Sequence, residues 1–162
     1  MANVDYFLKI EGVDGESTDD KHKGEIEIAS WSMGATNAGS FSSGGGGGTG
    51  KVSMNNFNIV KKTDKASAKL FTACCTGEHL KQATLVCRKA GGEQQEFLTI
   101  ILTSVLVSSY QTSGSSGSDV IPMEQVSMDF GKIEYKYKEQ KPDGSLGGEA
   151  VGGWDVTTNK KV

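Results

Sequence analysis

Apolar and polar residues alternate along several short stretches of the chain, which is the pattern of half-buried β-strands. The first stretch, Val4 to Ile10, alternates around Tyr6, Leu8 and Ile10. Turn residues separate it from later stretches of the same kind, at 25–33, 52–60, 83–89, 96–110, 126–137 and 153–157. The run at 126–137 divides at Gly131, so these runs amount to about eight short strands. The sequence therefore predicts an all-β fold, a small closed or partly closed β-barrel of two sheets.

The apolar positions change phase within some of these strands. Ile26 and Ile28 fall on one face, whereas Trp31 continues the pattern on the other, which predicts either a bulge or bend near Ala29 or burial of both faces. A similar change of phase occurs at Gly131. Bulges and bends at such points allow a sheet to curve into a barrel.

The strand at 96–110 is apolar on both faces. Its two alternating sets are Leu98, Ile100, Leu102 and Leu106 on one face and Phe97, Ile101, Val105 and Val107 on the other. One face of an antiparallel sheet is normally solvated. Burial of both faces indicates a partner surface as well as the core, with a two-layer core as the alternative.

One helix is predicted at about 64–76, with the sequence DKASAKLFTACCT. Asp64 can cap its N-terminus, and Gly77 ends it. Its apolar residues share one face: Leu70, Phe71, Cys74 and Cys75. We therefore expect the two cysteines to be buried, inert thiols.

The cysteines and histidines have no recognisable metal-site spacing. Cys75 and His79 lie four residues apart, but Gly77 interrupts the helix between them and no further ligand follows. Cys87 makes the cysteine count odd, so no disulfide framework is expected. His22 lies in the charged stretch ESTDDKHK, where a solvated imidazole is expected.

Composition favours a single domain, 1–162. The chain has 22 glycines among 162 residues, and a chain of this length buries roughly 70% of the surface that its unfolded form exposes. Its 17 basic and 20 acidic side chains give a formal charge of -3, which argues against a dedicated nucleic-acid binder. No apolar stretch suggests a cleavable signal peptide or membrane insertion, so synthesis in the cytoplasm is expected.

A long glycine-rich loop is predicted at 34–50. It has no periodic apolar pattern and contains five consecutive glycines, Gly44 to Gly48. Connections of this length inside a compact domain are usually functional or disordered. A run of glycines holds one conformation only when something outside it fixes the backbone. The loop is therefore a candidate contact arm.

The same loop nearly matches a phosphate-binding P-loop. Gly45, Gly50 and Lys51 have the spacing of that motif. Val52, however, stands where a hydroxyl would bind magnesium, and the following residues predict a strand instead of the helix that such a site needs. A chance match is the favoured interpretation, with a nucleotide site as the alternative.

Taken together, several stretches resemble the haemolysin-coregulated protein (Hcp) family, the tube subunit of type VI secretion systems. The resemblance covers nearly the whole chain. It rests on EIEIASWSMG, GGGGGTGKV, DKASAKLFTACCTGEH, RKAGGEQQEFLTIILTSVLVSS, FGKIEYKY and GGWDVTTNKKV.

The resemblance implies a structural protein without a cofactor: a homo-hexameric ring that stacks into tubes inside a contractile sheath. A spike protein would tip the tube, and baseplate components would be further partners. The resemblance further implies that the ring stays in the cytoplasm until firing, is then secreted, and carries small effector toxins in its lumen. It assigns lumen contacts to Trp31 and Ser32. The assembly loop would contain Thr36, Phe41, Gly44, Gly46, Gly48, Thr49 and Lys51.

Two other functions compete with this one. One is a small nucleotide-binding or hydrolytic enzyme that uses Gly45 to Lys51, although no Ser, His and acid constellation supports nucleophilic catalysis. The other is a monomeric β-barrel that binds a ligand in its interior.

Overall fold

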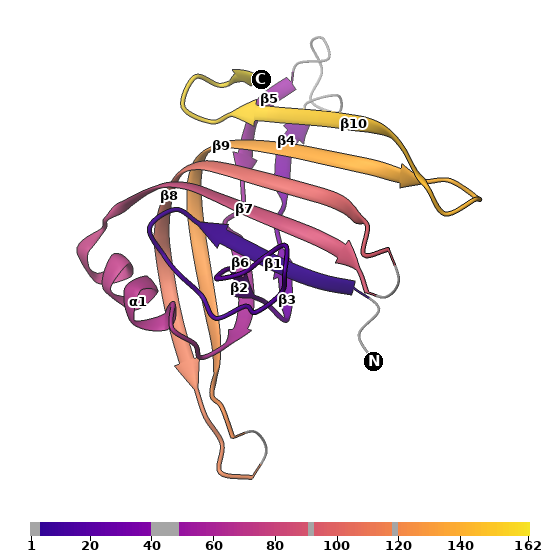
Figure 1. Ribbon diagram of the computed structural model, residues 1–162. Helices are drawn as coiled ribbons and strands as arrows, with labels where there is room; N and C mark the ends of the chain where they lie inside the picture. The colour runs from indigo at the N-terminus through magenta and orange to yellow at the C-terminus, as the bar shows by residue number, and fades with distance from the viewer. Residues whose placement is uncertain (1–3, 40–48, 91–92, 118–119) are drawn as a thin grey trace.

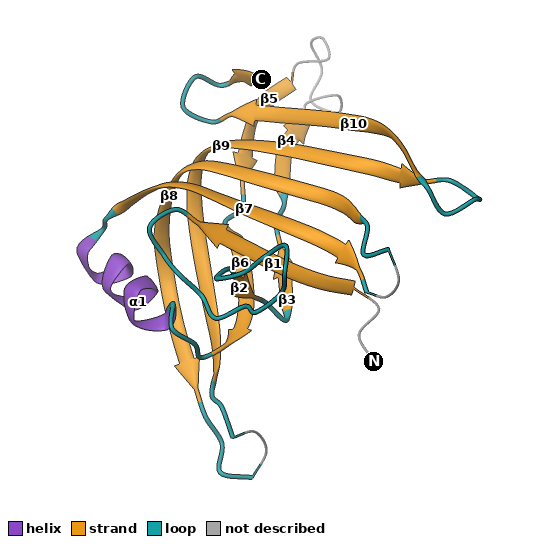
Figure 2. Ribbon diagram, viewed as in Figure 1, coloured by secondary structure: helices purple, strands orange, loops and turns teal. Residues whose placement is uncertain are grey.

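β-Strands dominate the computed structural model, which describes residues 4–39, 49–90, 93–117 and 120–162 (Figures 1 and 2). In chain order the elements are β1 Val4–Ile10, β2 Ile26–Glu27, β3 Ser30–Ser32, β4 Ala35–Gly39, β5 Thr49–Met54, β6 Phe57–Lys62, α1 Ser67–Thr76, β7 His79–Lys89, β8 Glu96–Ser113, β9 Met123–Gln140, β10 Leu146–Asp155 and β11 Lys160–Lys161. The predicted all-β class is confirmed. The strand expected at 153–157 is the end of the longer β10.

The long strands β8 and β9 form the centre of the main sheet. They pair antiparallel with each other, and β7 and β1 follow in turn beyond β8. The outer edge of β9 is shared, because residues 123–128 pair with β6 and residues 132–140 pair with β10. Figure 1 shows the resulting curved sheet, with β6 and β10 leaving β9 in different directions.

Both long strands change face where Ser104 lies opposite Gly131. The buried positions of β8 step from Leu102 to Val105, and those of β9 shift at the same level. Ser104 has a φ of 59°, in the left-handed region, and a Cβ on Gly131 would lie 3.3 Å from the Ser104 Cβ. Glycine therefore leaves room for the bend, and the predicted change of phase at Gly131 is confirmed.

This bend overturns part of the prediction for the long strand. The alternation predicts Val105 and Val107 on the face opposite Leu98, but all three lie in one core. Leu106 turns to the other face and is only half-buried. The second apolar face is thus smaller than predicted, because the change of face at Ser104 moves later residues across the strand.

Residues 26–32 connect the two ends of the curved sheet. β2 pairs with β1, and β3 pairs with β6. Between them the N–H of Ile28 donates to the Tyr6 carbonyl at 3.2 Å, and the N–H of Ala29 donates to the Val60 carbonyl at 2.7 Å. The bend expected near Ala29 is therefore present, and it brings the strands around the core.

Helix α1 covers one end of that core (Figure 2). It spans Ser67–Thr76, later than the predicted start at 64, because Asp64 lies in a preceding turn where its carboxylate accepts the Ala66 N–H at 2.9 Å. Gly77 ends the helix in the left-handed conformation, as predicted. Its buried residues are Ser67, Leu70 and Ala73. Within the described ranges, no helix is long and apolar enough to cross a membrane.

Candidate functional site

β3 places the two predicted lumen residues on opposite faces. Trp31 packs toward the core, with its ring stacked 6.0 Å from that of Phe57. Ser32 is exposed, and its Oγ lies 3.5 Å from the Asn58 amide nitrogen. Alternation along a strand produces this separation. Ser32 is thus accessible to a partner, whereas Trp31 supports the strand from the core side.

The predicted arm is partly a β-hairpin. β4 and β5 pair antiparallel, with Thr36 opposite Ser53 and Gly39 opposite Thr49. The sequence predicts an unpatterned loop over 34–50, and this is wrong for residues 35–39 and 49–50, because backbone pairing orders a stretch that has no apolar alternation. Thr36 and Lys51 are exposed on the hairpin. Phe41, Gly44, Gly46 and Gly48 lie outside the described residues.

The P-loop interpretation finds no support in the part of the motif that is described. Gly50 and Lys51 lie within strand β5, which leads into β6, as the sequence predicts for the residues after Val52. Gly50 has a packing role, because a Cβ there would lie 2.8 Å from the Ala38 carbonyl oxygen. Gly45 lies outside the described residues. The glycine at position 50 is thus explained by the close approach of β4.

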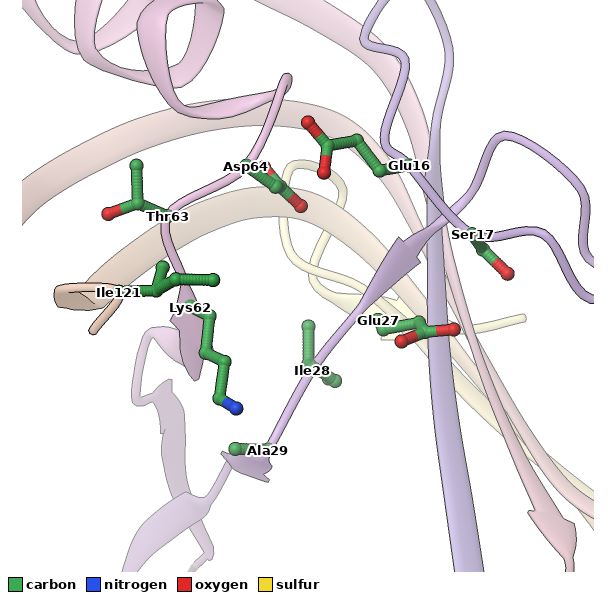
Figure 3. Close-up of a pocket in the computed structure, with 9 residues that line it drawn as sticks. All are labelled: Glu16, Ser17, Glu27, Ile28, Ala29, Lys62, Thr63, Asp64 and Ile121. Atoms are coloured by element: carbon green, nitrogen blue, oxygen red, sulfur yellow. The ribbon is translucent and has the colours of Figure 1, made fainter. Parts of the chain in front are cut away.

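A surface cavity of about 370 Å³ lies between the loop before β2, the residues that join β2 to β3, and the end of β6. Figure 3 shows the carboxylates of Glu16 and Asp64 in the upper part of the cavity and the Lys62 ammonium group below them, toward Ala29. The complete lining is Glu16, Ser17, Glu27, Ile28, Ala29, Lys62, Thr63, Asp64 and Ile121. These lining residues include neither histidine nor cysteine.

A buried polar cluster lies under the start of α1. The Lys61 ammonium group is 2.8 Å from Glu124 Oε1 and 2.8 Å from Asp64 Oδ1. Ser67 donates to Glu124 at 2.9 Å, and the Tyr110 hydroxyl also donates to that carboxylate. The sequence carried a signal for this cluster, since Lys61 and Glu124 occupy positions in phase with apolar core residues of β6 and β9.

Burial and charge act in opposite directions on this cluster. Burial tends to raise the pKa of Glu124, but hydrogen bonds from Lys61, Tyr110 and Ser67 outweigh it and lower that pKa. Burial and the adjacent carboxylate raise the pKa of Tyr110 to about 12. The cluster thus pairs the Lys61 ammonium group with two carboxylates and adds neutral donors, which satisfies its buried charges.

A second cluster ties the loop at 11–25 to the outer face of β1 and β7. The Arg88 guanidinium group lies 2.7 Å from Asp19 and 3.1 Å from Asp5. The hydrogen bond from Arg88 lowers the pKa of Asp19 to about 2. Arg88 also lies 4.8 Å from the centre of the Phe7 ring. These contacts hold the loop over the apolar Phe7 side chain.

His22 belongs to the same loop, and the expectation of a solvated imidazole is wrong. Its ring is buried and stacks on Phe7 at 4.3 Å. Nδ1 lies 3.0 Å from a Glu25 carboxylate oxygen, and Nε2 lies 2.7 Å from Glu96. The charged composition of the loop concealed this contact, because Glu96 is 74 residues away in sequence.

The cysteines also differ from the prediction. Cys75 is exposed and Cys74 is half-buried, whereas Cys87 is buried in β7. Phe71 is expected on the buried face, but its side chain is exposed. Its ring makes an edge-to-face contact with the ring of Tyr110. The helix packs through a narrower face than the pattern predicts. Among the described residues, no group of three or more His, Cys, Asp or Glu side chains is placed to hold a metal ion.

Comparison with known proteins connects this architecture to secretion. Residues 7–137 match the family model described as "Type VI secretion system effector, Hcp". The chain belongs to the Hcp family. The predicted family resemblance is confirmed, and the protein is therefore a type VI secretion tube protein.

Individual Hcp proteins agree with this assignment. Protein hcp1 of Pseudomonas aeruginosa is 45% identical over 158 residues, which cover 96% of this chain and 97% of that protein. A solved structure described as a type six secretion system protein shares 37% identity and a TM-score of 0.93, covering 98% of this chain and 99% of that one. Hcp1 from Salmonella typhimurium shares 35% identity and a TM-score of 0.82, covering 99% and 100%.

Proposed function

We propose that this Hcp protein is a ring-forming subunit of the secretion tube, in which six copies close a ring and rings stack into a tube. The tube would pass through a contractile sheath anchored on a baseplate, with a spike protein at its tip. Small effector toxins would travel in the lumen. The protein would remain in the cytoplasm until firing and would then be secreted, without acting as an enzyme.

The observation that carries this proposal is the near-complete match to a type six secretion protein, with a TM-score of 0.93. An exposed apolar surface on β9 and β10 adds support. Tyr135 and Tyr137, which lie opposite Gly152 and Ala150 of β10, are 41% and 43% exposed. Association between copies of a chain commonly covers surfaces of this kind.

The hairpin of β4 and β5 supplies a second contact surface in this proposal. It forms a separate two-stranded sheet, and Figure 1 shows it projecting from the curved sheet near β10. Thr36, Thr49 and Lys51 would contact neighbouring subunits or the next ring. Their position on a projecting hairpin suits contact between rings better than a role within the core.

Ser32 is the proposed cargo contact in the lumen. Its hydroxyl is exposed on the outer face of β3, while Trp31 on the inner face holds the strand against Phe57. In this arrangement Trp31 fixes the strand that presents Ser32, and it does not itself contact cargo. The assignment refines the prediction that both residues contact cargo in the lumen.

Solution mass tests the ring directly. We expect light scattering to give about 103 kDa, which is six times the chain mass of 17.1 kDa. Addition of ATP should leave that mass unchanged. A species of 17.1 kDa that persists over a wide concentration range would refute ring formation and favour a monomeric barrel. Binding of ATP at Lys51, abolished by Lys51→Ala, would favour the nucleotide-binding alternative.

A further inference from the structure

The outer face around Ser32 continues across four strands. Ser32 of β3 lies opposite Asn58 of β6, Asn58 lies opposite Ser127 of β9, and Ser127 lies opposite Ser109 of β8. Directly opposite residues in paired strands place their side chains on the same face. These four residues form the Ser32 row, which the sequence spreads over 96 positions, from 32 to 127.

Hydrogen bonds orient the side chains of this row. Ser127 Oγ donates to Asn58 Oδ1 at 2.6 Å, and Asn58 Nδ2 donates to the Asn56 carbonyl at 3.1 Å. Since a backbone carbonyl only accepts, the second contact fixes which end of the Asn58 amide carries the NH₂ group. That group also points at Ser32 Oγ, 3.5 Å away.

The orientation leaves different hydrogen-bonding groups free at the two serines. Ser32 Oγ faces a donor on Asn58, so its own hydroxyl hydrogen remains available to an acceptor outside the chain. Ser127 uses its hydrogen on Asn58, so its oxygen lone pairs remain available to an outside donor. Neighbouring strands lie about 4.8 Å apart, which separates these two groups by roughly 10 Å.

The Ser32 row and the row next to it on the same face contain no charged side chains. The adjacent row contains Ser30, Val60, Gln125 and Gln111. Charged side chains begin one position beyond, at Lys62 on one side and Asp129 on the other. The second half of β9 is different, because Lys132, Glu134 and Lys136 alternate along it. Neutrality is therefore a local property of the face that includes Ser32.

We propose that the Ser32 row binds polypeptide cargo through neutral peptide and amide groups, with Ser32 as a donor, Ser127 as an acceptor and Asn58 as the positioning residue between them. This inference rests on the proposed function of carrying effectors. A neutral surface neither attracts nor repels a cargo of either net charge, so one tube can accept acidic and basic effectors. Contact through hydrogen bonds also predicts binding that depends little on salt.

The test uses the assembled wild-type ring and a defined probe. The probe is the polypeptide that co-purifies most abundantly with the tagged ring from cells with an active type VI apparatus, identified by mass spectrometry and then produced separately. Its affinity for the ring is measured by calorimetry at 50 and 500 mM NaCl. Light scattering and circular dichroism establish that each variant still assembles and folds.

Three variants and one matched control separate the contributions. We expect Ser32→Ala, Ser127→Ala and Asn58→Leu each to weaken binding about tenfold, the usual effect of losing one or two hydrogen bonds. Combining Ser32→Ala with Asn58→Leu should weaken binding little more than Asn58→Leu alone, because loss of Asn58 already removes the orientation of Ser32. Ser113→Ala, an exposed serine two rows from the Ser32 row on the same strand as Ser109, should bind like the wild type.

A charge introduced at position 58 tests whether Asn58 faces the cargo, because a residue with only a structural role would not alter how binding depends on salt. Asn58→Asp should make binding strongly salt-dependent, stronger for a basic probe and weaker for an acidic one. Wild-type affinity that falls steeply between the two salt concentrations would overturn the neutral-surface proposal. So would unchanged affinity in both Ser127→Ala and Asn58→Leu. A wild-type ring that binds no polypeptide would instead refute the carrier function itself.

Discussion

Replacing Lys61 with methionine is expected to destabilise the fold strongly. Lys61 and Glu124 are 0% and 1% exposed, and their charged atoms lie 2.8 Å apart. Removing one partner of a buried pair costs about 3–5 kcal/mol, because the other charge stays buried. We expect about 4 kcal/mol for Lys61→Met. Glu124 would then retain only neutral donors, from Tyr110, Ser67 and Thr63.

The opposite replacement, Glu124→Gln, should be milder. Lys61 keeps the Asp64 carboxylate at 2.8 Å, so its charge remains paired, and we expect a loss of about 2 kcal/mol. The double variant Lys61→Met/Glu124→Gln removes both charges of the buried pair. Its loss should therefore be smaller than the sum of the single losses by at least about 1 kcal/mol.

Urea unfolding followed by circular dichroism measures these free energies. The protein concentration must be held constant, because association makes apparent stability depend on concentration. Equal losses in the two single variants, or a double variant that equals their sum, would refute this account of the buried pair.

The pH dependence supplies a second readout. In the wild type the pKa of Glu124 lies below its usual 4.5, so its stabilising contribution is present above that pH and is lost as pH falls through the lowered pKa. In Lys61→Met the same pKa should rise, because burial continues to act without the ammonium group. That variant should gain stability relative to the wild type on acidification from neutral pH.

Three further predictions concern function, assembly and thiol chemistry. Ser32→Arg should leave the mass of the ring unchanged but abolish co-purification of an effector; unaltered co-purification would show that Ser32 is not a lumen contact. Deletion of Gly44 to Gly48 should preserve the circular dichroism spectrum and weaken stacking of rings in electron micrographs, since loops tolerate change better than cores; normal stacking would contradict the arm. Iodoacetamide should label exposed Cys75 in the native protein but buried Cys87, whose pKa burial raises to about 12, only after unfolding; equal labelling rates would contradict the assigned burial.

Local patterns in the sequence were sufficient for the strand class and for several boundaries. β1 has the predicted bounds, Val4–Ile10, and Gly77 ends the helix where predicted. The bends at Ala29 and Gly131 were visible as changes of apolar phase. Such features depend on neighbouring residues, whose alternation and backbone preferences are written in the chain itself.

Contacts between distant segments were decided by the tertiary structure. His22 looked solvated in its charged loop, yet Glu96 and Phe7 enclose it. Residues 35–39 have no apolar alternation that predicts strand β4, because backbone pairing with β5 defines it. Lys61 and Glu124 carried a visible signal in their phase, but only folding brings β6 beside β9.

For the candidate site, the sequence and its family resemblance singled out Ser32, while the row around it follows from strand register. Asn58, Ser127 and Ser109 are ordinary polar residues in a sequence rich in serine and glycine. Pairing of β3, β6, β9 and β8 brings them into line with Ser32. A register shift of one residue would reverse every one of these side chains, so their common face is a property of the assembled sheet and of no single strand.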